Sequence, residues 1–198
     1  MGKRMMDLCL AALGLALFAP LILILALAIK LDSTGPVFFR QERVGRHGRV
    51  FRIHKFRTMR HEPTKDARQI TIGADPRITR VGAWIRKRRL DEIPQLIDVI
   101  KGDMSIVGPR PEVPRYVAHY PQAVREKVLA LRPGITDPAS LAFRHEAELL
   151  AAAADPEREY VEVIMPQKLR HAIAYAEQAS VWTDLKLIGR TLKVLASG

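Results

Sequence analysis

LCLAALGLALFAPLILILALAI, residues 8–29, carries no charged side chain and is long enough to form a helix that crosses the hydrocarbon core of a bilayer. It is longer than the apolar core of a secretory signal, and no convincing small-x-small cleavage site follows it, so we expect it to stay attached to the chain. The run therefore predicts a membrane-associated protein.

Pro20 and the charges on both flanks oppose a simple crossing. Proline lacks an N–H and clashes with the carbonyl of Ala16, so we expect the helix to break there. The two arms would be about 18 and 14 Å long, too short for a core of about 30 Å. By the positive-inside rule, cations on both flanks favour the cytoplasmic side: Lys3, Arg4, Lys30, Arg40, Arg43, Arg46 and Arg49. We predict that residues 1–31 form a re-entrant helix-break-helix; a Pro-kinked spanning helix is the alternative.

The composition limits the remaining choices. The chain has 198 residues, which favours one domain with its own core. Lysine and arginine total 32 against 21 acids, a net charge of +11, so we expect an anionic partner: nucleic acid, a membrane surface or a phosphorylated substrate. The single cysteine, Cys9, excludes a disulfide framework and fits a reducing, cytoplasmic setting. The six histidines show no metal-binding spacing.

Residues 32–198 read as one continuous unit. GPVFFRQERVGRHGRVFRIHKFRTM, residues 35–59, predicts a basic β-hairpin that turns at Gly45 and Gly48. Residues 61–76 read as a loop or mobile cover, because they hold two prolines and many polar groups.

Helical patterns dominate the rest of this unit. ITRVGAWIRKRRL (78–90) predicts a basic amphipathic helix, and QLIDVIKG (95–102) predicts a short second helix. Most of the chain after residue 150 is helical in pattern, and the amphipathic segment 185–198 suits either an anionic membrane surface or the protein core. We therefore expect an α+β fold, mostly helical, with amphipathic helices at the membrane interface.

Two adjacent carboxylates, Asp91 and Glu92, lie between these two helices in RKRRLDEIPQ, residues 86–95. Neighbours in a helix point about 100° apart, so adjacent acids share one site only where the backbone bends. We expect Asp91 to cap the helix at 95–102 and Glu92 to lie in its first turn, with both carboxylates ionised. Such a pair suits a divalent cation or a nucleophile; a capping Asp followed by a first-turn Glu is the alternative.

Arginines beside prolines follow this pair. Arg110 lies between Pro109 and Pro111, which holds its backbone extended and prepares the guanidinium to bind phosphate. Arg132 precedes Pro133-Gly134, and Arg144 follows twelve residues on. Alone, each is equally consistent with a turn that carries a surface arginine.

Taken in order and spacing, four segments resemble one family: the proline-containing apolar segment, KFRTM (55–59), LDEIPQLIDVIKGDMSIVGPRPE (90–112) and RPGIT (132–136). They are similar to bacterial sugar transferases, the monotopic phosphoglycosyl transferases. The resemblance covers approximately residues 3–195, and its central block is very specific. The chain looks like the small members of the family that consist of the catalytic unit alone.

The resemblance implies a monotopic protein at the cytoplasmic face of the bacterial inner membrane. It implies transfer of a sugar-1-phosphate from a UDP-sugar to polyprenyl (undecaprenyl) phosphate, with Mg²⁺, in the first membrane step of glycoconjugate assembly. Asp91 would be the nucleophile, forming a phosphosugar-aspartyl intermediate and releasing UMP, and Glu92 would hold Mg²⁺ with it. The residues expected to bind substrate phosphates are Arg110, Arg144, Lys55 and Arg57. An anionic membrane surface is the further expected partner, nucleic acid is not expected, and a homodimer is compatible.

One segment departs from the family pattern. After RPGIT the family commonly continues with Gly, an aromatic or Leu, Ala-Gln and Asn-Gly-Arg, whereas this chain reads DPASLAFR, residues 137–144. Only the arginine, Arg144, is retained.

Two other functions compete with this interpretation. A membrane-anchored basic module that binds anionic lipid or nucleic acid explains the net charge, but not the Asp91-Glu92 pair. A different membrane transferase would show the spaced aspartates of CDP-alcohol phosphotransferases or the Asp-x-Asp of metal-dependent glycosyltransferases, and the sequence contains neither pattern.

Overall fold

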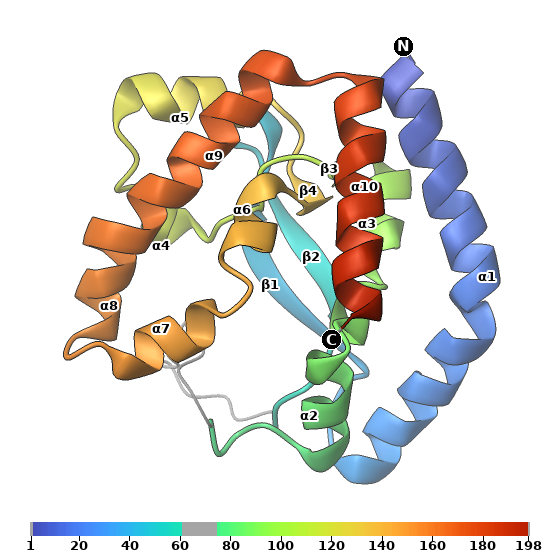
Figure 1. Cartoon of the computed structure of the whole chain (residues 1–198). Helices are drawn as coiled ribbons and strands as arrows, with labels where there is room; N and C mark the ends of the chain where they lie inside the picture. Colours follow the sequence, from blue (N-terminus) through green and yellow to red (C-terminus); the bar gives the residue numbers. More distant parts are fainter. Residues whose placement is uncertain (1, 61–74, 198) are drawn as a thin grey trace.

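The computed structural model describes residues 2–60 and 75–197, and it has the predicted α+β fold, mostly helical (Figure 1). The predicted loop at 61–76 lies almost entirely outside the described residues. The helices are α1 (Gly2–Asp32), α2 (Arg80–Lys87), α3 (Gln95–Lys101), α4 (Pro114–Val117), α5 (Gln122–Leu129), α6 (Pro138–Ala142), α7 (Glu146–Ala152), α8 (Pro156–Glu159), α9 (Met165–Gln178) and α10 (Val181–Ala196). The strands are β1 (Phe38–Val44), β2 (Val50–Phe56), β3 (Ser105–Val107) and β4 (Gly134–Thr136). Short turns of other helix types are η1 (Arg46–Gly48), η2 (Leu90–Glu92) and η3 (Tyr160–Ile164).

Helix α1 runs without interruption through Pro20, so the predicted break between two helical arms is wrong. Pro20 removes one N–H from the helix, but the Leu and Ala residues on both sides have high helix propensity and continue it. At a rise of about 1.5 Å per residue, α1 is about 46 Å long. It curves along one side of the molecule (Figure 1).

The first turns of α1 carry charged side chains that bind the rest of the molecule. Lys3 forms an ion pair with Asp184 of α10, whose side chain is fully buried. Asp7 is also buried and accepts hydrogen bonds from the Ser105 hydroxyl at 2.9 Å and the Ile106 N–H at 3.0 Å. These contacts fix the beginning of α1 against β3 and α10.

The last turn of α1 is held by the same body. The buried Arg57 side chain donates to the carbonyl oxygens of Ser33 at 2.7 Å and Ile29 at 3.2 Å. A cation at this position also complements the partial negative charge at the end of a helix. The Asp32 carboxylate accepts the Val81 N–H of α2 at 3.0 Å. Both ends of α1 are therefore bound to one body.

Between its two bound ends, α1 exposes apolar side chains. Leu13, Leu17, Leu23 and Leu27 are between 62% and 71% exposed. By length and composition the helix is able to cross a membrane. Exposed apolar side chains in this number mark an interaction surface, for a membrane or for another protein. The buried residues of α1 are Asp7, Ala11, Leu25 and Ile29.

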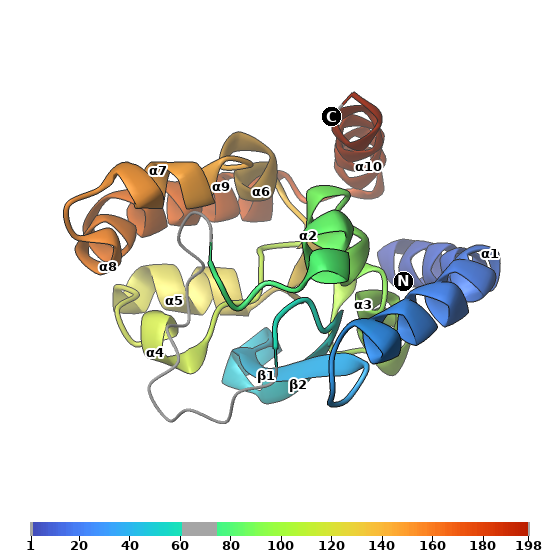
Figure 2. The ribbon, with the colours of Figure 1, turned by 90° about the horizontal axis from the view of Figure 1, so that it is seen from below.

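The predicted basic hairpin is confirmed. β1 and β2 pair antiparallel from Phe38 opposite Phe56 to Val44 opposite Val50, and η1 forms the turn. Phe56 is buried with Ile85 of α2 and with the last turns of α1. Figure 2 shows the hairpin next to the end of α1 from which it follows.

A second, parallel pair of strands joins two distant segments. β3 and β4 align Ser105 with Gly134 and Val107 with Thr136. Their ends pack so closely that a Cβ atom on Gly134 would lie 2.1 Å from the Gly108 backbone nitrogen. The segments VGPRP and RPGIT therefore form one unit that places Arg110 and the residues after Thr136 side by side.

Helices α4, α5, α7, α8 and α9 lie on the side of the molecule away from α1 (Figures 1 and 2). α4, α5, η3 and α9 enclose a second apolar core. Its buried members include Val113, Tyr116, Val128, Tyr160 and Leu169.

Helix α10 packs on the protein core with one face, as one of its two predicted roles requires, and it also exposes apolar side chains on another face. Leu187 packs in a cluster with Val107 and Tyr175. Trp182 and Leu192 point outward and are 73% and 62% exposed. The cations on the exposed surface of α10 are Lys186, Arg190 and Lys193.

We predict that Gly134→Ala lowers the free energy of unfolding by roughly 1–3 kcal/mol, because the new methyl group overlaps the backbone of Gly108. Thermal unfolding of the detergent-solubilised protein measures this effect. Gly189→Ala is the matched control: no atom lies within 4 Å of its new Cβ, and it removes a glycine from the interior of α10, so it should stabilise by about 0.5–1 kcal/mol. Equal melting temperatures for the two variants would contradict the close approach of the two segments.

Candidate active site

The acidic pair lies at a sharp bend between α2 and α3. Arg89 adopts a left-handed conformation (φ 55°), and η2 follows it with Asp91 and Glu92 as its last two residues. Helix α3 begins at Gln95 after Pro94, so the expectation that Asp91 caps this helix is wrong. The reason is the η2 turn, which uses residues 90–92 before α3 starts. The bend that adjacent acids require is nevertheless present.

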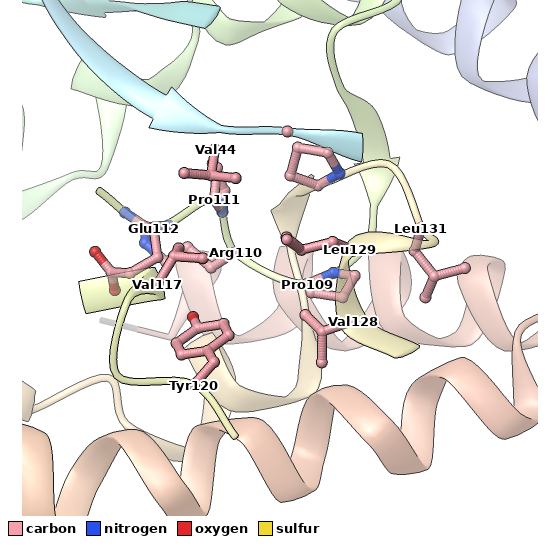
Figure 3. A pocket seen from close by; sticks show the side chains of 12 residues that line it. Val44, Pro109, Arg110, Pro111, Glu112, Val117, Tyr120, Val128, Leu129 and Leu131 are labelled. Carbon is pink, nitrogen blue, oxygen red and sulfur yellow. The ribbon is translucent and has the colours of Figure 1, made fainter. Parts of the chain in front are cut away.

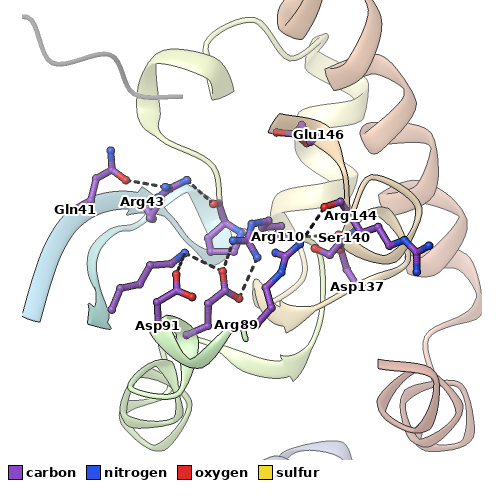
Figure 4. A network of polar contacts seen from close by, with 12 residues as sticks. Gln41, Arg43, Arg89, Asp91, Arg110, Asp137, Ser140, Arg144 and Glu146 are labelled. Carbon is purple, nitrogen blue, oxygen red and sulfur yellow. Dashed lines mark hydrogen bonds and ion pairs between the residues drawn. The ribbon is translucent and has the colours of Figure 1, made fainter. Parts of the chain in front are cut away.

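Glu92 is bound by two cations from two other segments. Arg110 donates to both Glu92 oxygens, at 2.5 Å and 3.3 Å, which is the two-pronged geometry that guanidinium favours. Lys55 of β2 donates to Glu92 Oε1 at 2.8 Å. Figure 4 shows Arg110 reaching toward the acidic pair. We call Lys55, Asp91, Glu92 and Arg110 the acid–cation group.

The cations keep Glu92 ionised although it is largely buried, with a side chain 12% exposed. Burial by itself would raise the pKa of this carboxyl. The charges of Arg110 and Lys55 outweigh it and hold the pKa of Glu92 well below its ordinary value. Glu92 in turn raises the pKa of the Arg110 guanidinium. Each partner therefore stabilises the charged form of the other.

Asp91 has a different environment from its neighbour. Its nearest cation is Lys55, with Nζ 3.8 Å from Oδ2. Burial raises the pKa of the Asp91 carboxyl above its ordinary value, Lys55 opposes that shift, and the adjacent Glu92 charge adds to it. The expectation that a helix N-terminus would favour ionisation of both acids is therefore wrong for Asp91, because its side chain caps no helix. A carboxylate with a raised pKa is more basic and a better nucleophile.

Lys55 is positioned by a buried pair that sequence reasoning missed. The Asp98 carboxylate of α3, which is fully buried, accepts the backbone N–H of His54 at 2.8 Å and lies 2.5 Å from its ring Nδ1. This contact fastens β2 to α3 one residue from Lys55. The two residues are far apart in sequence, so no local spacing signals that they meet.

The turn that carries Arg110 is also held from the hairpin and from η3. Arg43 of β1 donates to the Pro111 carbonyl oxygen at 3.0 Å and to the Glu112 carboxylate at 3.3 Å. The Tyr160 hydroxyl donates to the other Glu112 oxygen. The guanidinium of Arg110 therefore extends from a turn with little freedom.

The other two predicted phosphate-binding residues lie outside the acid–cation group. The Arg57 side chain binds the end of α1, as described above, and is 4% exposed. The Arg144 side chain extends away from Asp91 in Figure 4 and donates to His145 at 2.9 Å. The backbone of Arg144 is closer to the site, because its carbonyl oxygen accepts a hydrogen bond from Arg89 at 3.2 Å.

Two hollows lie near this part of the molecule, and neither is centred on the acidic pair. Figure 3 shows a cavity of about 10 Å³ between Arg110, Val117 and Tyr120, too small for any organic substrate. A larger hollow of about 530 Å³ lies between the hairpin turn and α5, lined by His47 and Arg125 among others. Asp91 and Glu92, whose side chains are 14% and 12% exposed, line neither of these two hollows.

The donor set of the site fits Mg²⁺ only together with oxygens of a substrate. No three His, Cys, Asp or Glu side chains converge in residues 2–60 and 75–197. Two adjacent carboxylates are present, and Mg²⁺ is commonly held by one or two carboxylates, waters and substrate phosphates. Asp91 and Glu92 are the residues that fit such a role.

Comparison with known proteins agrees with this chemistry. A protein of Aeromonas hydrophila, named UDP-N-acetylgalactosamine-undecaprenyl-phosphate N-acetylgalactosaminephosphotransferase, is 38% identical over 198 residues, which cover 99% of this chain and 44% of that protein. A UDP-glucose:undecaprenyl-phosphate glucose-1-phosphate transferase of Caulobacter vibrioides is 42% identical over 197 residues, covering 98% and 69%. One of the same name in Escherichia coli is 38% identical over 194 residues, covering 96% and 39%.

The chain thus spans less than half the length of two of these relatives and about two thirds of the third. The family model described as bacterial sugar transferase matches residues 1–198, and so includes every segment that builds the acid–cation group. On this evidence the chain belongs to the bacterial sugar transferase family.

Proposed function

We propose that this protein transfers a sugar-1-phosphate from a UDP-sugar to polyprenyl phosphate, with undecaprenyl phosphate as the natural acceptor. The observation that carries the proposal is the acid–cation group: Asp91, whose ion pair with Lys55 is 3.8 Å long, lies beside Glu92, which is held by Lys55 and Arg110 at 2.8 Å and 2.5 Å. The names of the relatives, which act on UDP-sugars and undecaprenyl phosphate, support the substrate class.

In the first half-reaction, Asp91 attacks the β-phosphorus of the UDP-sugar. A bond forms between an Asp91 oxygen and phosphorus, and the bond from this phosphorus to the oxygen bridging the two phosphates breaks. UMP leaves with that oxygen, and the sugar phosphate remains on Asp91. The raised pKa of Asp91 suits this role, and so does its geometry. Its ion pair with Lys55 is 3.8 Å long, whereas Glu92 is held by Lys55 at 2.8 Å and by Arg110 at 2.5 Å.

In the second half-reaction, a phosphate oxygen of polyprenyl phosphate attacks the same phosphorus. The bond to Asp91 breaks, and the carboxylate is restored as the polyprenyl diphosphosugar leaves. Lys55 and Arg110 lie where charge on the transferred phosphoryl group would develop, and fixed cations stabilise such charge. The chemistry that Mg²⁺ supplies when it is held by Asp91 and Glu92 is neutralisation of the diphosphate charge.

We place this reaction at the cytoplasmic face of the bacterial inner membrane, with α1 re-entrant rather than spanning. The support is the attachment of both ends of α1 to one body, through Lys3 and Asp7 at one end and Asp32 and Arg57 at the other. A helix held in this way cannot pass to the opposite side of a bilayer without breaking one set of contacts. Its curved apolar middle would enter a single leaflet.

Helix α10 extends the proposed membrane face. Its outward Trp182 and Leu192 would enter the interfacial region, with Lys186, Arg190 and Lys193 toward anionic headgroups. The beginning of α10 lies beside the beginning of α1, as the pair between Lys3 and Asp184 requires. The two helices therefore present one combined apolar surface to the bilayer.

A covalent intermediate is the sharpest test of the proposed reaction. Mixing the protein with UDP-glucose or UDP-N-acetylgalactosamine and Mg²⁺, without polyprenyl phosphate, should add one sugar phosphate to the chain and release UMP. Mass spectrometry of peptides should locate it on Asp91, and hydroxylamine should remove it. In Asp91→Asn, which is nearly the same size, the adduct should disappear while the melting temperature stays within about 2 °C. UMP that appears only when lipid acceptor is present, without any adduct, would instead favour a direct displacement.

The two-pronged grip of Arg110 on Glu92 predicts a second result. Arg110→Lys keeps the charge but loses the fork, so turnover should fall by about tenfold or more. Arg132→Lys is the matched control, because Arg132 also precedes a proline but donates to a backbone carbonyl, that of Gly102, at 3.1 Å. Equal losses of turnover in the two variants would make the Arg110 contact a general structural one.

The proposed topology is tested by labelling. In a Cys9→Ser background, Gly2→Cys and Ser33→Cys should both react with thiol reagents only from the cytoplasmic side, because both ends of α1 are attached to the catalytic body. Reaction of position 2 only from the periplasmic side would replace the re-entrant helix by a kinked spanning one.

A further inference from the structure

The segment that departs from the family pattern begins with a buried carboxylate, Asp137, which is 2% exposed. Its two oxygens bind two different backbone N–H groups. Oδ1 accepts the Ser140 N–H at 2.7 Å and so caps α6. Oδ2 accepts the Arg110 N–H at 3.2 Å. Figure 4 shows Asp137 and Ser140 next to the turn that carries Arg110.

The contact of Asp137 Oδ2 is with the only backbone N–H group of the turn at residues 109–111. Pro109 and Pro111 carry no N–H, so Arg110 supplies the only amide hydrogen of residues 109–111. Two carbonyl oxygens of the turn are also bound: that of Pro109 accepts the Gly134 N–H at 3.0 Å, and that of Pro111 accepts the Arg43 guanidinium at 3.0 Å. Asp137 and Gly134 together therefore fix the backbone from which the Arg110 guanidinium extends to Glu92.

Helix capping alone does not account for a carboxylate at this position. A cap needs one acceptor oxygen, and serine or asparagine supplies it about as well as aspartate. Asp155 shows the simple case in the same chain: it is exposed, and only Oδ1 is used, accepting the Glu157 and Arg158 N–H groups at 3.1 Å. Asp137 is buried and uses both oxygens, and burying a carboxylate is costly unless both are paired. Its charge also favours the cationic form of Arg110.

We propose that Asp137 is a positioning residue that holds the Arg110 backbone through Oδ2, so that the guanidinium meets Glu92 in the geometry needed for phosphosugar transfer. The DPAS segment would then replace the family's usual sequence with a direct support for the active site. This inference rests on the proposed function for its catalytic meaning, but the contact itself is a property of the fold.

The contact is tested by amide hydrogen exchange on the full chain in detergent. In the wild type the Arg110 amide should be protected, and in Asp137→Ser it should exchange at least about tenfold faster, because serine keeps the cap and has no second oxygen for Arg110. Asp155→Ser, the same exchange at a cap remote from the site, should leave the Arg110 amide unchanged. Equal protection of this amide in wild type and Asp137→Ser would overturn the proposal.

The catalytic consequence is tested by UMP release from labelled UDP-sugar in a double-mutant cycle. Asp137→Ser alone should lower turnover by about tenfold to a hundredfold, as expected for a displaced catalytic group. In an Arg110→Ala background it should lower turnover no further, because it acts through Arg110. An equal loss in both backgrounds would make Asp137 a purely structural residue. If the wild type released no UMP, the proposed function would fail, whereas the exchange experiment would still decide the contact.

Discussion

The ion pairs at Glu92 are the interaction on which the rest of the structure depends. One carboxylate joins three segments that are distant in the chain: β2 through Lys55, the bend between α2 and α3, and the turn at residues 109–111 through Arg110. A largely buried carboxylate is stable only when its oxygens are paired, so each cation has to be delivered accurately. Asp98, Asp137 and Arg43 fix the backbone segments that carry these cations, and Asp91 lies beside this cluster of charge with an ion pair of 3.8 Å to Lys55.

Lys55 and Arg110 are each positioned by contacts that hold the backbone of the segment that carries them. The strand that carries Lys55 is fastened by Asp98 through the His54 N–H. The turn that carries Arg110 is fastened by Asp137 and by the close approach of Gly108 and Gly134. Side chains extending from such constrained backbones lose little freedom when they bind a phosphate, which is the physical basis of preorganised electrostatic catalysis.

The membrane helix belongs to the same construction. α1 supplies Leu25 and Ile29 to the core that holds Phe56, the residue directly before Arg57. Arg57, which the sequence suggested as a phosphate ligand, binds the end of this helix instead. The two basic residues Lys55 and Arg57 therefore have different partners. Lys55 pairs with Asp91 and Glu92, whereas Arg57 binds the end of α1. A shift of α1 would therefore displace Phe56 and Arg57 and, through them, the neighbouring Lys55.

The sequence by itself determined the classes of structure and chemistry. The uncharged run 8–29, the hairpin at 35–59 and the bend at Asp91-Glu92 follow from local rules of hydrophobicity, turn residues and helix geometry. Tertiary structure alone decided which cations meet the acids: Lys55 and Arg110 do, whereas Arg57 and the Arg144 side chain do not. It also decided that Asp98 and Asp137 support the site. The physical reason is that these contacts join residues far apart in the chain, so their formation depends on how whole elements pack, which no local pattern specifies.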